Sequence, residues 1–93
     1  MASANIVSIG TGSLAAGAST TKGWNNPPLG KVLGFWVQPR KLQDGEFVTG
    51  KPAFQITKVV TEMDKPNHFV VLVTVKNTGN ISFGFELFQS YLS

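Results

Sequence analysis

The chain has no cysteine among its 93 residues, and it is poor in histidine, tyrosine and charged side chains. Without thiols it cannot carry out cysteine-based catalysis, build a cysteine-ligated zinc site or hold an iron–sulfur cluster. Charged residues make up only 14% of the sequence, against about 25% in typical soluble domains. The net charge of +3 comes from scattered cations, which argues against nucleic acid as a partner because such binding needs clustered Lys and Arg.

Long apolar runs are also missing. No run reaches the ~20 residues that a membrane-spanning helix needs, so we expect no membrane span. Residues 1–18 have neither a basic start nor a continuous apolar core, so they do not resemble a signal peptide. We therefore expect a cytoplasmic protein or a mature domain of a larger or exported one. The length predicts a single domain over residues 1–93.

The clearest positive signal is strict alternation between residues 69 and 91. A β-branched run from Phe69 to Val75 is followed by Asn-Thr-Gly-Asn at residues 77–80 and by a second run that alternates with a period of two. Such a period predicts a strand with one buried face, and the turn letters predict a hairpin whose Asn and Gly adopt positive φ. The predicted buried face comprises Ile81, Phe83, Phe85, Leu87 and Tyr91.

Further strands are predicted along the rest of the chain. Gly10 to Gly12 should end the first one, Pro27 and Pro28 mark a loop, and Asp44-Gly45 is a hairpin-type dipeptide before a brief pairing at Phe47 and Val48. Together with ten glycines and five prolines, this rhythm predicts an all-β fold, an antiparallel β-sandwich of about seven strands with immunoglobulin-like character. The remaining strand segments are residues 5–9, 19–24, 31–38 and 54–62.

One stretch resembles a known group of domains. Val73 to Asn80, with the letters V-T-V-K-N-T-G-N, followed by Phe85 to Leu87, resembles the closing hairpin of immunoglobulin-like β-sandwich modules. The CARDB-type adhesion modules are the nearest of these, and the resemblance covers residues 69–91. It implies a sandwich that serves as a spacer, adhesion unit or binding platform without a catalytic centre.

The titratable residues do not predict an active site. The single histidine, His68, and Asp64 flank a proline-containing turn, where both should be solvated, whereas a catalytic base needs a buried acid and an activated nucleophile. Asp44 and Glu46 are the best candidates for cation ligands, but a glycine turn explains them more simply. We therefore expect no catalytic residues, no metal site and no cofactor.

Aromatic side chains offer one hypothesis for a ligand. Trp24 stands beside Asn25 and Asn26 before two prolines, and Tyr91 lies near the end of the chain. An exposed indole can stack on the apolar face of a sugar ring while neighbouring amides bond its hydroxyls. This combination suggests a lectin-like carbohydrate binder as the alternative function.

Strands that are apolar on both faces offer the leading hypothesis. Residues 31–37 and 69–75 have this character, which predicts central strands or an exposed functional face. A two-layer domain of this size should leave one such face in solvent unless another subunit covers it. We therefore expect a non-catalytic module that forms a homo-oligomer, with Trp36 serving either as an inter-sheet plug or as a partner contact. The candidate interface residues are Val32, Trp36, Leu72 and Phe88.

Overall fold

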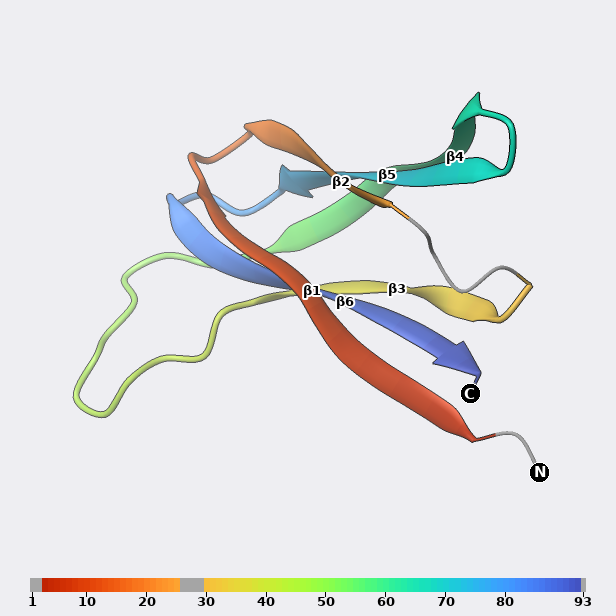
Figure 1. Cartoon of the computed structure of the whole chain (residues 1–93). Coiled ribbons are helices and arrows are strands. Elements are labelled where there is room, and N and C mark those ends of the chain that lie inside the picture. The colour runs from red at the N-terminus through yellow and green to blue at the C-terminus, as the bar shows by residue number, and fades with distance from the viewer. Residues whose placement is uncertain (1–2, 26–29, 93) are drawn as a thin grey trace.

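The computed structural model describes residues 3–25 and 30–92 and folds them into six β-strands. Two three-stranded antiparallel sheets lie in separate layers, the first with strand order β1-β6-β3 and the second with order β2-β5-β4 (Figure 1). This confirms the all-β sandwich, with six strands in the described residues instead of about seven. The strands are β1 (Ala4–Leu14), β2 (Ser19–Asn25), β3 (Val32–Pro39), β4 (Phe54–Lys65), β5 (His68–Asn77) and β6 (Phe83–Leu92).

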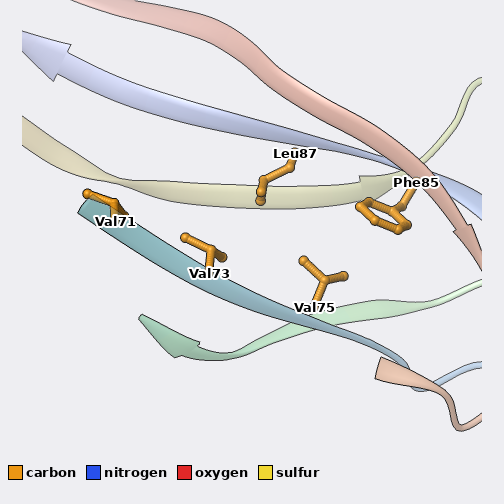
Figure 2. Packing of buried hydrophobic residues seen from close by; sticks show 5 residues of the cluster. All are labelled: Val71, Val73, Val75, Phe85 and Leu87. Atoms are coloured by element: carbon orange, nitrogen blue, oxygen red, sulfur yellow. The ribbon is translucent and has the colours of Figure 1, made fainter. Parts of the chain in front are cut away.

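The core forms where the two central strands face each other across the layers. Every second residue of β5 and β6 points inward, because successive side chains of a strand alternate between its faces. Figure 2 shows the valines of β5 beneath the aromatic and aliphatic side chains of β6. The alternation predicted from Ile81 to Tyr91 is thereby confirmed from Phe83 onward, whereas Ile81 precedes β6 and lies in the crossing between the layers. The fully buried apolar residues are Val71, Val73, Val75, Phe85 and Leu87, each no more than 3% exposed.

The hairpin predicted at residues 77–80 is wrong. β5 and β6 belong to different sheets, so this segment crosses from one layer to the other. The side chain of Asn77 is fully buried and donates hydrogen bonds of 2.9 Å to the carbonyl oxygens of Leu14 and Ile81. Its own Oδ1 accepts a hydrogen bond of 2.9 Å from the N–H of Gly79. Asn77 therefore fixes the crossing by linking the ends of three segments.

Gly79 is needed for close packing, and the predicted positive φ is not found there. In the described part of the chain, positive φ occurs at Gly17, Gly30, Gly45 and Asn67. A Cβ atom on Gly79 would lie only 2.2 Å from the carbonyl oxygen of Lys51, so the residue must be glycine for the backbones to approach.

The true hairpin lies between β4 and β5. Lys65 pairs with His68, and Asn67 at the turn has a φ of 59°. The turn predicted around Pro66 is therefore confirmed, because Asn tolerates the left-handed conformation that such turns need.

β1 does not end at its glycines, as the sequence suggested. The strand continues through Gly10 and Gly12 along β6, with a β-bulge between Ser8 and Gly10. A Cβ atom on Gly12 would lie 2.8 Å from the ring of Phe85. Glycine at this position makes room for a core aromatic, which explains why it belongs to a strand.

Candidate functional site

An apolar hollow lies on the outer face of the first sheet. Trp36 of β3 pairs directly with Phe88 of β6, and Ile6 of β1 pairs with Ser90 of β6. The exposed fractions of Trp36 and Ile6 are 64% and 74%. Together with Gln38, these side chains line a hollow of about 310 Å³. We call Ile6, Trp36, Gln38, Phe88 and Ser90 the Trp36 patch.

The alternation of side chains along each strand places these residues on the outer face of the first sheet. In β3, Phe35 and Val37 pack against the core, so Trp36 between them points outward. The indole N–H of Trp36 donates a hydrogen bond of 3.1 Å to Oε1 of Gln38. The polar edge of the ring is thus satisfied within the chain, and the apolar surface of the ring remains open to a partner.

Only half of the predicted interface set meets at this patch. Trp36 and Phe88 are neighbours across β3 and β6, whereas Val32 pairs with Tyr91, which belongs to the inward-facing series of β6. A β-bulge between Val32 and Gly34 shifts the alternation by one residue and so places Val32 on the other side from Trp36. Leu72 lies between inward-pointing valines of β5 and faces out from the second sheet.

Two further expectations about this strand need correction. β3 lies at the edge of its sheet in the described structure, so its two apolar faces do not indicate a central strand. Trp36 is also not an inter-sheet plug, since nearly two thirds of it is exposed. Ile6 was missed as a patch residue because its position depends on pairing with β6 rather than on a local motif.

The described members of the predicted ligand-binding set do not form an exposed platform. Trp24 lies on β2 instead of in a loop, and it packs against the core with its ring centroid 5.5 Å from that of Phe35. Tyr91 is half-buried in the inward-facing series of β6. Asn25 is exposed at the end of β2, and Asn26 lies outside the described residues.

A long loop over residues 40–53 joins β3 to β4, and we call it the β3–β4 loop. Gly45 has a φ of 81° in a turn, but the pairing predicted for Phe47 and Val48 does not form. The guanidinium of Arg40 donates two hydrogen bonds to the carboxylate of Glu46, at 2.9 and 2.5 Å. Such a two-point contact fixes both position and orientation.

The same carboxylate closes the tip of the loop. It accepts a hydrogen bond of 2.9 Å from the backbone N–H of Gln43. The hydrogen bonds from Arg40, and then the one from Gln43, lower the pKa of Glu46 to about 2. The carboxylate of Glu46 is thus engaged by Arg40 and by the backbone of the turn.

The β3–β4 loop is also tied to the first sheet. The guanidinium of Arg40 lies 4.6 Å from the centroid of the Phe83 ring, a distance typical of a cation–π contact. Near the other end of the loop, the N–H of Lys51 donates a hydrogen bond of 2.7 Å to the side chain of Asn80. The loop therefore has a defined shape, and it presents Phe47 with an exposed fraction of 91%.

The single histidine lies away from the patch, at the hairpin of the second sheet. Nδ1 of His68 lies 2.5 Å from Oδ1 of Asp64, and this contact lowers the pKa of the Asp64 carboxyl. Over residues 3–25 and 30–92, no group of three or more His, Asp or Glu side chains could hold a metal ion. The same described residues contain no helix that is long and apolar enough to cross a membrane.

Comparison of the chain with protein-family models gave no match, and comparisons with curated proteins and with solved structures gave none either.

Proposed function

We propose that this chain is a non-catalytic interaction module that forms homo-oligomers through the outer face of its first sheet. The observation that carries the proposal is the Trp36 patch, in which a largely exposed indole adjoins Phe88 and Ile6 around an apolar hollow. Trp is one of the residue types enriched at the energetic centres of protein interfaces. An apolar cluster of this kind costs solubility unless a partner covers it.

The overall dimensions support the same proposal. A compact protein of 10.0 kDa exposes about 5,200 Å², whereas this chain exposes 6075 Å². The excess of roughly 850 Å² is close to the ~800 Å² that each partner buries in a standard interface. The radius of gyration of 15.0 Å also exceeds the ~12 Å of a compact domain of this length. The isolated chain is therefore more open than its length requires, and by about the area that one neighbour would cover.

Sedimentation equilibrium tests the proposal. We expect the mass of the unaltered chain to rise above 10.0 kDa with concentration. The variant Trp36→Ala should remain at the monomer mass. Met63→Ala is a matched control, because Met63 is 60% exposed but lies on β4 in the second sheet. An unaltered chain that stays monomeric at millimolar concentration would overturn the proposal.

Carbohydrate binding is a second candidate, and one observation favours it. Trp36 combines an open ring surface with the amide of Gln38 and the hydroxyl of Ser90 at the same hollow. This is the combination of ring and polar groups that sugar sites use, although it lies on different residues from Trp24, Asn25 and Tyr91. A glycan array probed with the unaltered chain and with Trp36→Ala tests it, and signals that survive the substitution would exclude this site.

The finer relationship to immunoglobulin-like and CARDB-type modules also remains a proposal. Its support is that two antiparallel sheets face each other and pack through the inward side chains of their strands. The closing hairpin that suggested it is replaced by a crossing between layers, so the resemblance now depends on the architecture alone. An experimental structure with a different strand order from β1-β6-β3 and β2-β5-β4 would remove that support.

A further inference from the structure

Phe47 stands out among the exposed apolar side chains because its ring is almost entirely exposed and the residue before it is fixed by hydrogen bonds. Its exposed fraction of 91% is the largest of the large apolar residues in the described structure. It directly follows Glu46, whose carboxylate is fixed by Arg40 and by the N–H of Gln43. Single exposed apolar residues are common, but here the preceding Glu46 is held by three hydrogen bonds, so the backbone beside Phe47 has already lost part of the entropy that binding costs. The loop therefore has the character of a preorganised anchor.

In the described structure Phe47 lines neither the hollow of the Trp36 patch nor the hollow of about 700 Å³ beside Arg40 and Phe83. Figure 1 shows the β3–β4 loop extending beyond the end of the first sheet at which β3 finishes. The Trp36 patch lies on the sheet itself, with Phe88 and Ser90 toward the opposite, C-terminal end of β6. Phe47 is not among the residues that line the hollow. The exposed aromatic and the apolar hollow thus lie at separate parts of one elongated molecule.

We propose that Phe47 of one copy inserts into the Trp36 patch of a second copy, an inference that rests on the proposed self-association. The hollow of about 310 Å³ is at the lower end of the range for binding pockets, a size suited to one aromatic side chain with its neighbours. Trp36 and Phe88 would provide two ring surfaces, and aromatic pairs prefer tilted or offset contacts at such sites. Gln38 and Ser90 would form a polar rim around the inserted ring.

The charged residue that directly precedes the anchor, Glu46, is paired within its own chain. Arg40 and Glu46 neutralise each other through their two-point contact, so the tip of the loop does not bring an unpaired charge from this pair to an apolar surface. Ser8, which pairs with Phe88, and Ser90, which pairs with Ile6, are neutral neighbours on the outer face of the sheet. Glu86, which pairs with Gln38 beside the hollow, is charged but is not among the residues that line it, so the groups that insertion would bury in the hollow itself are apolar or neutral polar.

The arrangement predicts a head-to-tail assembly. Each copy has one anchor and one hollow, and these are different surfaces, so the contact is heterologous. Such contacts close into a ring or continue as an open chain, whereas a contact between two identical patches stops at a dimer. We expect the average mass to grow beyond twice 10.0 kDa as the concentration rises.

Complementation between two variants tests this proposal. Phe47→Ala keeps its hollow and Trp36→Ala keeps its anchor, so each variant alone should associate at least ~10-fold more weakly than the unaltered chain. Mixed together, they retain one intact contact and should form a 1:1 pair that grows no further. Sedimentation velocity on each variant and on the mixture measures all three cases. Near-ultraviolet circular dichroism confirms that both variants are folded, which the exposure of both side chains leads us to expect.

The outcomes distinguish a failure of the head-to-tail contact from a failure of self-association. If the unaltered chain associates and Phe47→Ala associates equally well, the head-to-tail contact is wrong while self-association stands. If both variants are monomeric and their mixture is also monomeric, the anchor does not fit the hollow and the inference again fails. If the unaltered chain is itself monomeric at millimolar concentration, the proposed function fails, and the inference fails with it.

Discussion

Replacing Asn77 by alanine should destabilise the fold more than any other single loss of a polar side chain in the crossing between layers. Its amide donates to the carbonyl oxygens of Leu14 and Ile81 and accepts from the N–H of Gly79. That N–H keeps a second acceptor, the carbonyl oxygen of Ala53 at 3.2 Å, so the substitution orphans chiefly two carbonyl groups. At about 1–2 kcal/mol for each partly buried group, the expected loss is ~2–4 kcal/mol.

Urea unfolding followed by tryptophan fluorescence measures this loss. The midpoint should fall while the denaturant dependence stays constant, and all samples need the same low protein concentration because assembly would add stability. Asn80→Ala is the matched control, since the exposed Asn80 accepts one hydrogen bond, from the N–H of Lys51, and should cost about 1 kcal/mol. Equal losses for the two variants would refute the role assigned to Asn77.

Three further predictions follow from single contacts. Gly79→Ala should strongly destabilise the fold, because the added Cβ atom would lie 2.2 Å from the carbonyl oxygen of Lys51. Gly34→Ala is its control, because a Cβ atom there would have no neighbour within 4 Å, and the urea midpoint should stay nearly unchanged. The pKa of Glu46 is lowered from 4.5 to about 2, so its contribution to stability is complete above about pH 4.5 and is lost as the pH falls toward 2. The difference in urea midpoint between the unaltered chain and Glu46→Gln should therefore shrink over that interval, and a constant difference would contradict the ion pair. The variant Trp24→Phe keeps only the exposed Trp36, and Trp36→Phe keeps only Trp24, which packs against the core. Iodide should therefore quench the emission of Trp24→Phe more strongly than that of Trp36→Phe. Equal quenching in dilute samples would contradict these placements.

The alternation of apolar residues was sufficient to predict most of the strands and the part of the core that β6 contributes, Phe85 and Leu87. Val73, Val75, Phe85 and Leu87 all occupy the buried faces that a period of two implies. This works because burial of one face is a local property of a strand. The partner of each strand is not local, and Asn77 to Asn80 have the same letters in a hairpin and in a crossing between layers. The sequence therefore could not show that β5 and β6 face each other instead of pairing.

The candidate site was predicted in part for the same reason. Trp36 and Phe88 were identified because both lie on apolar strands, and their direct pairing across β3 and β6 brings them together. Val32 was misplaced because the bulge between Val32 and Gly34 reverses the faces, and Gly34 was the one sign of that bulge in the sequence. Phe47 gave no signal as an anchor, since its exposure depends on the path of the β3–β4 loop, which no local sequence pattern predicts.

The most direct test of self-association follows the environment of Trp36 itself. In the variant Trp24→Phe, Trp36 is the only tryptophan, so iodide quenching of the remaining emission reports on the Trp36 patch alone. We expect strong quenching in dilute samples, and a fall in quenching together with a blue shift as the concentration rises and a second copy covers the ring. Quenching that remains equally strong at every concentration would contradict the account.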